Sequence, residues 1–200
     1  MISDLYITFV FLLLLSGTYR LNFISKYTVL NIVFCVLIYL VVFKDGSIMP
    51  DYQVYKDNYY NVAAGNYNIF VEPSYLLISK LFSPLGTYGF YFVLATYGII
   101  TLKLHFIILE FNEKDVDFSL ILYLSNFFIL FTMVQIRAGV ALGFIYLAMR
   151  SYQSWKKYIL YMLCAVFFHY SSLIFLPLIF IRKIKLKNQT IFWILMFSYV

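Results

Sequence analysis

The chain has 200 residues, of which 64% are hydrophobic and only 12% are charged. A soluble domain has about 45–50% apolar and about 25% charged residues, so this composition excludes an ordinary soluble globular protein. It predicts an all-α, polytopic helical membrane protein, and we treat residues 1–200 as one integral membrane domain. The net charge of +6 does not indicate nucleic-acid binding, because most basic residues lie in short loops between apolar segments.

The first two apolar segments determine the predicted topology. A spanning helix needs about 20 apolar residues, and residues 5–19 and 27–43 are the first segments near that length. The N-terminus has no basic region, so we expect residues 5–19 to be a retained span and not a cleaved signal peptide. Arg20 and Lys26 lie between the two spans and place that loop in the cytoplasm. The N-terminus and residues 44–87, which are acidic on balance, are therefore expected to be extracytoplasmic.

The external segment leads into a third span. Residues 74–82 predict a short amphipathic helix at the membrane interface, ended by Ser83 and Pro84. Residues 88–109 predict a span that returns inward, with His105 in an interfacial position near its inner end, and residues 110–117 form a charged inner loop. Cys35 and Cys164 are isolated in separate apolar segments, so no disulfide framework or metal-ligand spacing is present.

The next two apolar segments, 118–149 and 158–181, each allow two interpretations. As one helix, residues 118–149 would be about 48 Å long, whereas the hydrocarbon core is about 30 Å thick. A break at Gln135–Arg137, and another at His169–Ser172, would give hairpins of short helices. Hairpins keep all the nearby basic residues in the cytoplasm, as the positive-inside rule favours. These residues are Arg150, Lys156, Lys157, Arg182, Lys183, Lys185 and Lys187.

Two ionisable residues lie inside these apolar segments. Arg137 is within 118–149, and His169 is midway through 158–181. A charge at membrane depth costs several kcal/mol, so such residues usually face a cavity, have a partner and serve a function. The alternatives are a structural ion pair for Arg137 and a structural hydrogen bond for His169. Gly139 and Gly143 are spaced for close helix packing.

Several short motifs follow one another between residues 51 and 187. They are Pro50-Asp51-Tyr52 with Tyr55 and Tyr59, then Glu72-Pro73-Ser74-Tyr75, then Gln135-Ile136-Arg137 before a small-residue helix, and Phe168-His169-Tyr170-Ser171-Ser172. Their order resembles the EpsG family of bacterial exopolysaccharide and capsule assembly, which is similar to Wzy-type O-antigen polymerases. Family members commonly have Gly where this chain has Ser74. They are also longer, and an apolar run from Ile191 to Val200 is too short to span, so we expect the N-terminal part of a longer protein.

The resemblance implies a glycosyltransferase that acts as a polymerase at the outer face of the bacterial cytoplasmic membrane. Donor and acceptor would both be oligosaccharides on undecaprenyl diphosphate. The expected partners are this lipid-linked substrate, membrane lipids, and a chain-length regulator and flippase of the same pathway. No cofactor or metal is expected.

Residue chemistry assigns roles within that reaction. Arg137 offers a planar set of donors to the diphosphate leaving group, and Asp51, Glu72 and His169 are candidate bases for the attacking hydroxyl. We prefer Asp51, by analogy with membrane enzymes that use lipid-phosphate donors. Its alternative is a solvated loop carboxylate, and that of Glu72 is a helix cap. The predicted catalytic residues are Asp51, Arg137 and His169, and the predicted substrate-binding residues are Glu72, Tyr52, Tyr55 and Gln135.

Two other classes of function stay open at this point. A flippase for lipid-linked sugars would also need an intramembrane arginine, but it would be expected to show paired repeats and charges at both leaflets. No internal repeat is seen in the sequence. A structural subunit of a polysaccharide assembly complex is the third possibility.

Overall fold

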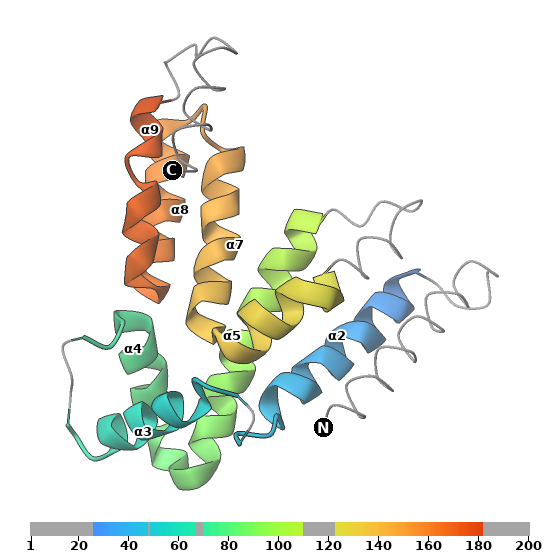
Figure 1. Cartoon of the computed structure of the whole chain (residues 1–200), viewed down its shortest axis with the longest axis vertical. Helices are drawn as coiled ribbons and strands as arrows, with labels where there is room; N and C mark the ends of the chain where they lie inside the picture. The colour runs from blue at the N-terminus through green and yellow to red at the C-terminus, as the bar shows by residue number, and fades with distance from the viewer. Residues whose placement is uncertain (1–25, 48, 67–69, 110–122, 182–200) are drawn as a thin grey trace, which may run out of the picture.

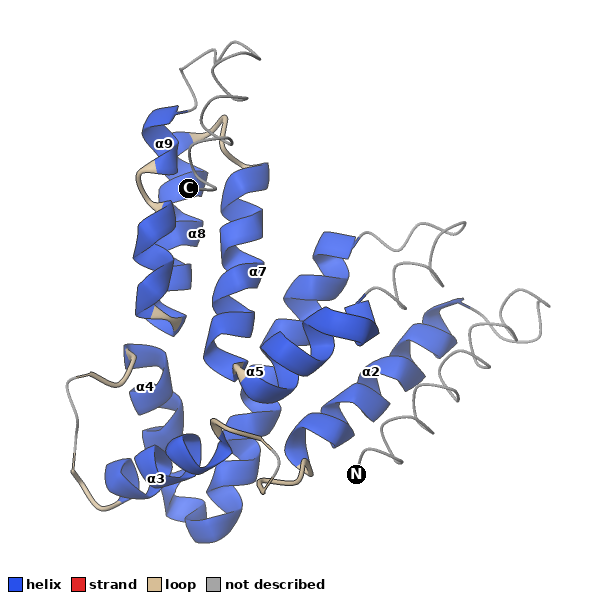
Figure 2. Ribbon diagram, viewed as in Figure 1, coloured by secondary structure: helices blue, strands red, loops and turns tan. Residues whose placement is uncertain are grey.

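The computed structural model describes residues 26–47, 49–66, 70–109 and 123–181. All regular structure in these ranges is helical (Figure 2). The all-α prediction is therefore confirmed for the described part of the chain. The predicted span 5–19, the inner loop 110–117 and the final apolar run 191–200 lie outside the described residues.

Two long helices match the predicted second and third spans. α2 (Lys26–Val42) and α5 (Gly89–Leu109) correspond to the expected segments 27–43 and 88–109. They pack against each other through buried side chains such as Leu37 of α2 and Leu102 of α5, both 0% exposed. At 21 residues, α5 is about 32 Å long, which matches the thickness of a bilayer core.

The chain between these two helices is also helical. α3 (Tyr52–Ala63) buries Tyr55, Tyr59 and Val62, which lie on one face at intervals of four and three residues. The sequence predicted only a polar external region here, so helix α3 was not predicted. α4 (Pro73–Phe82) confirms the short helix predicted at 74–82.

α4 and α5 form a hairpin. Gly86 has a positive φ of 59°, which few other residues adopt, and it turns the chain within η1 (Ser83–Tyr88). The rings of Tyr75 and Tyr97 then lie 6.0 Å apart, and those of Phe82 and Phe92 lie 5.5 Å apart. Within the described residues, the segment Pro73–Ile107 that contains this hairpin is the one long and apolar enough to cross a membrane.

The structure resolves the two ambiguous segments in favour of breaks. Residues 118–149 contain η2 (Tyr123–Val134), wound as a π-helix, and α7 (Ile136–Arg150), and the two helices meet at Gln135. Residues 158–181 contain α8 (Trp155–Phe168), η3 (Tyr170–Phe175) and α9 (Leu178–Ile181), with extended backbone at His169. The Tyr158 hydroxyl donates to the Phe175 carbonyl at 2.5 Å, so the second segment doubles back on itself. Figure 1 shows α7 beside this second hairpin.

Gly139 and Gly143 permit the close packing that their spacing predicts. A Cβ added to Gly139 would overlap the carbonyl oxygen of Phe131 in η2. A Cβ added to Gly143 would lie 2.8 Å from the Cβ of Leu104 in α5. α7 therefore contacts both η2 and α5 through positions that have no room for a larger side chain.

We expect Gly139→Ala to destabilise the protein by about 1–3 kcal/mol, because the backbones of α7 and η2 would have to separate. Gly98→Ala is the matched control, since the nearest atom to its added Cβ would be the Cγ1 of Val41, at 3.1 Å. Thermal unfolding in detergent measures both variants. Equal midpoints for the two would contradict the close approach of η2 to α7.

The two ends of the molecule give a test of topology. The end of α3 and the connection between α7 and α8 lie at opposite ends of the structure (Figure 1). Asn61, near the end of α3, and Gln153, between α7 and α8, are both exposed. After replacement of Cys35 and Cys164 by serine, we expect Asn61→Cys to react with an impermeant thiol reagent in intact cells. Gln153→Cys should react only after lysis, because it lies beside Arg150, Lys156 and Lys157. The reverse pattern would overturn the predicted orientation.

Candidate functional site

Three helix ends bring a carboxylate, a guanidinium and an imidazole together. Glu72 is the residue before α4, Arg137 is the second residue of α7, and His169 follows the last residue of α8. One oxygen of Glu72, Oε2, accepts a hydrogen bond from Nη1 of Arg137, and the other, Oε1, lies 2.9 Å from Nδ1 of His169. We call these three residues the Glu72 cluster.

Local structure directs each of the three side chains into the cluster. Glu72 begins α4 but makes no side-chain capping hydrogen bond, so its carboxylate is free to reach the other two helices. A favourable interaction of this carboxylate with the dipole of α4, the alternative considered for Glu72, stays a prediction. Arg137 follows Ile136, which is 1% exposed and anchors the start of α7. Phe168 packs with its ring centroid 5.8 Å from those of both Tyr97 and Phe144, and so fixes the end of α8 before His169.

Hydrogen bonding and the charge of Arg137 keep the Glu72 carboxylate ionised although it is buried. Its side chain is only 6% exposed, compared with 19% for Arg137 and 32% for His169. Burial raises the pKa of Glu72, but the hydrogen bond from His169 and the charge of Arg137 outweigh burial, so this pKa lies below its usual range. An ionised carboxylate only accepts hydrogen bonds, so Nδ1 of His169 carries the proton in this pair. In the neutral imidazole, Nε2 then has its lone pair free.

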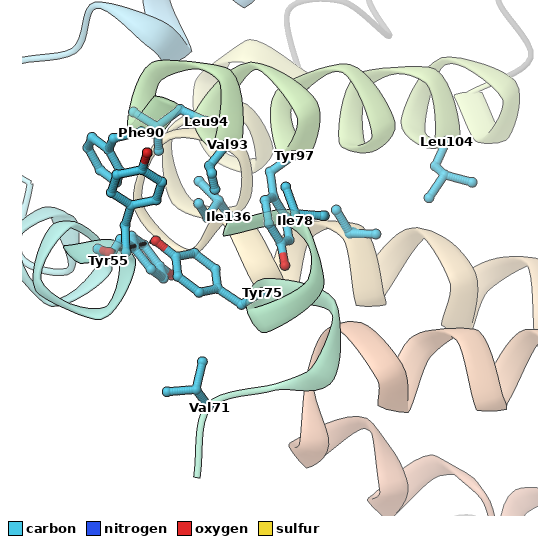
Figure 3. Close-up of a cluster of buried hydrophobic side chains, with 12 residues drawn as sticks. Tyr55, Val71, Tyr75, Ile78, Phe90, Val93, Leu94, Tyr97, Leu104 and Ile136 are labelled. Atoms are coloured by element: carbon cyan, nitrogen blue, oxygen red, sulfur yellow. Dashed lines mark hydrogen bonds between the residues drawn. The ribbon is translucent and has the colours of Figure 1, made fainter. Parts of the chain in front are cut away.

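Tyrosines surround the guanidinium. Cζ of Arg137 lies 4.9 Å from the ring centroid of Tyr55 and 5.8 Å from that of Tyr75, distances at which cation–π attraction operates. The Tyr75 hydroxyl donates to the carbonyl of Tyr55 at 2.6 Å, and the hydroxyls of Ser74 and Tyr97 lie 2.8 Å apart. Figure 3 shows these aromatic side chains between α3, α4 and α5. Nε of Arg137 is buried and has no hydrogen-bond partner in the described structure.

The structure therefore brings together four of the seven predicted site residues, which are Glu72, Arg137, His169 and Tyr55. Tyr52 begins α3 and packs edge-on against Phe90, with ring centroids 5.3 Å apart. The side chain of Gln135 is exposed, and its backbone forms the junction between η2 and α7. Roles for these two residues in substrate binding stay predictions.

Asp51 lies outside the Glu72 cluster. It is the residue before α3 and makes no side-chain capping hydrogen bond. Among the described residues, no hydrogen bond or ion pair joins its carboxylate to Arg137 or His169, and its charge acts on Lys44 and on the hydroxyl of Tyr55. Its predicted role as a base is therefore not supported by contact with the cluster, and it stays a prediction.

Two further polar residues are buried. Lys44 was placed in a polar loop, but it is 6% exposed and donates from Nζ to the carbonyl of Met133. His105 is 5% exposed, because α5, η2 and α7 enclose it, and its expected place near the membrane interface stays a prediction. Its Nε2 lies 3.1 Å from the carbonyl of Gly139, and its Nδ1 lies 3.3 Å from the hydroxyl of Tyr123. Nothing in the local sequence of either residue indicates these contacts.

Metal binding has no candidate in the part of the chain that the structure describes. Those residues hold no group of three or more His, Cys, Asp or Glu side chains placed to bind one ion. What the cluster offers chemically is a buried negative charge held by two donors, a second imidazole nitrogen that has a lone pair when the ring is neutral, and a partly unsatisfied guanidinium.

Comparison with known proteins identifies the chain at the level of family. The sequence model of the EpsG family matches residues 27–200, a range that includes every residue of the Glu72 cluster. No curated protein and no solved structure matches the chain. The apolar segment Pro73–Ile107 and this match together indicate a membrane protein of polysaccharide assembly. The chain belongs to the EpsG family.

Proposed function

We propose that the protein is a polysaccharide polymerase of the bacterial cytoplasmic membrane. It transfers a growing sugar chain between undecaprenyl-diphosphate-linked repeat units at the outer face, with a multi-pass topology and an extracytoplasmic N-terminus. Family membership supports a role in polysaccharide assembly. The observation that carries the proposal further is the buried Glu72 carboxylate, which contacts Arg137 and His169 at the meeting of three helix ends.

In this reaction His169 is the general base. The acceptor hydroxyl forms a bond to the anomeric carbon of the donor sugar and loses its proton to Nε2 of His169. Glu72 accepts the Nδ1 proton of the same ring in a hydrogen bond, which orients the imidazole and stabilises the cation that forms. A carboxylate and a histidine so arranged are a common means of activating a hydroxyl.

Arg137 stabilises the leaving group. The bond between the anomeric carbon and the diphosphate oxygen breaks, and negative charge collects on the departing lipid diphosphate. Guanidinium groups match phosphate oxygens, and they act strongly where water is excluded. Glu72 uses Nη1 of Arg137, whereas the buried Nε has no partner in the described structure. A buried donor without a partner costs about 1–3 kcal/mol.

The ring faces of Tyr55 and Tyr75 complete the arrangement. They hold the guanidinium plane from two helices without neutralising its charge. Arg137 is therefore positioned before substrate binds, and little reorganisation is needed as charge develops.

Arg137→Lys tests the role of the guanidinium. We expect polymer formation to fall by about 10²–10³-fold, equivalent to about 2–4 kcal/mol, because Lys keeps the charge but not the planar set of donors. Arg150→Lys, the same change at the other end of α7, is the matched control and should keep wild-type activity. The assay follows conversion of single lipid-linked repeat units to polymer at equal protein abundance. Wild-type polymer from Arg137→Ala would leave Arg137 as a structural charge and remove the proposed chemistry.

His169→Asn tests the base separately from the contact with Glu72. The Asn amide can still donate to Oε1 of Glu72, but it has no basic atom in place of Nε2, so we expect a loss of about 10²–10⁴-fold in rate. Ser171→Ala, an exposed position two residues later, controls for disturbance of the junction. Full activity in His169→Asn, together with inactivity of Asp51→Asn at every pH, would transfer the role of base to Asp51.

A flippase gives a different result in the same experiments. If the protein transported lipid-linked units, Arg137→Ala would leave single units on the cytoplasmic side of the membrane. The proposed polymerase would leave them unpolymerised on the outer side, where an impermeant sugar-modifying reagent reaches them in intact cells.

A further inference from the structure

Lys44 is a buried cation that contacts the end of η2. It follows α2 by two residues, is 6% exposed, and donates from Nζ to the carbonyl oxygen of Met133, 89 positions later in the chain. Met133 is the second-last residue of η2. The last carbonyls of a helix have no donor within the helix, and a positive charge at that end is favourable. Lys44 supplies both the donor and the charge.

The carbonyl that Lys44 holds lies close to Arg137 along the chain. Gln135, the junction residue, has φ −95° and ψ 64°, and its N–H still donates to the carbonyl of Leu130 in η2 at 2.9 Å. Its own carbonyl accepts from Gly139 in α7, also at 2.9 Å. The direction in which α7 begins therefore depends on where η2 ends.

We propose that Lys44 is a positioning residue, which fixes the junction between η2 and α7 and thereby holds Arg137 against Glu72. This inference rests on the proposed function, because its kinetic consequence is the placement of the leaving-group arginine. It also gives Asp51 a role other than that of base, which is to keep the Lys44 ammonium charged.

The electrostatics around Lys44 support its role as a positioning cation and the role of Asp51 as the carboxylate that keeps it charged. Burial lowers the pKa of Lys44 to about 8, and the charge of Asp51 acts in the opposite direction. The other titratable groups near this region in the described structure are engaged elsewhere. Asp45 bonds to Ser47, Tyr39 and Tyr91 pack on Phe43, and Tyr123 bonds to Thr132 and His105.

The kinetic test compares pH profiles at equal protein abundance. Loss of the Lys44 proton removes the cation from Met133, so wild-type activity should fall as pH rises through about 8. Lys44→Arg should keep activity near pH 7 and lose this alkaline fall, because a guanidinium does not deprotonate in that range. Lys44→Met should lower kcat by about 10- to 100-fold with KM unchanged, the size expected when a catalytic group is misplaced.

Asp51→Asn separates the two roles considered for that residue. Without the carboxylate the alkaline fall should move to lower pH, because Asp51 no longer raises the pKa of Lys44. A loss of activity at every pH would instead identify Asp51 as a base and overturn its assignment as the partner of Lys44. An unchanged alkaline fall in Lys44→Arg would overturn the role of Lys44.

A double-mutant cycle tests the positioning itself without any enzymatic activity. If Lys44 holds Arg137 against Glu72, Arg137→Ala should lower the thermal midpoint less in the Lys44→Met background than in the wild type. Additive losses would refute the positioning role even if the polymerase assay succeeds. If the losses are non-additive but the protein makes no polymer, the positioning role of Lys44 is supported and the proposed function is refuted.

Discussion

The ionised carboxylate of Glu72 is the group on which the arrangement of the site depends. A buried carboxylate is costly unless donors compensate for the water it has lost. Here the compensation comes from two side chains, Arg137 and His169, that lie 65 and 97 positions away in the chain. If either donor is removed, the charge that remains is poorly compensated. The ends of α4, α7 and α8 are thus held together by the solvation of one anion.

Helix breaks and polar side chains occur at the same places in this structure. A break inside an apolar environment exposes backbone groups that need partners, and such breaks are tolerated where they line a protein interior. The end of η2 has its partner in Lys44, and the carbonyl of Gly139 in the first turns of α7 has His105 nearby. The break after α8 places His169 beside Glu72. Residues that a hydropathy profile would treat as interruptions are therefore the residues that make the breaks stable.

The long helices α2 and α5 and the helix breaks could be predicted from the sequence because both follow from length and hydropathy. Residues 118–149 are too long for one crossing, and the charges after them favour a return to the same side, which identified the junction at Gln135. Arg137 and His169 stood out because few ionisable residues occur inside apolar segments. The family could be recognised from the order of short motifs, and the match to residues 27–200 confirms it.

The partners of these residues could not be predicted in the same way. Asp51 and Glu72 have similar local surroundings in the sequence, and only the fold shows that Glu72, of these two, reaches Arg137. Lys44 directly follows an apolar segment, a position typical of a topology-determining charge, so its burial depends on contacts with η2 that no local pattern encodes. The π-type winding of η2 likewise has no signal in its sequence, which is ordinary for an apolar helix.

The separation of the three cluster residues along the chain has a consequence for biosynthesis. Ribosomes deliver the chain from its N-terminus, so Glu72 emerges 65 residues before Arg137 and 97 residues before His169. During that interval its carboxylate must stay in contact with water or with the insertion machinery, because its eventual donors have not been made. Maturation of the site therefore waits until the end of α8 has been made. Translation itself thus keeps the site incomplete until most of the described helices have been made.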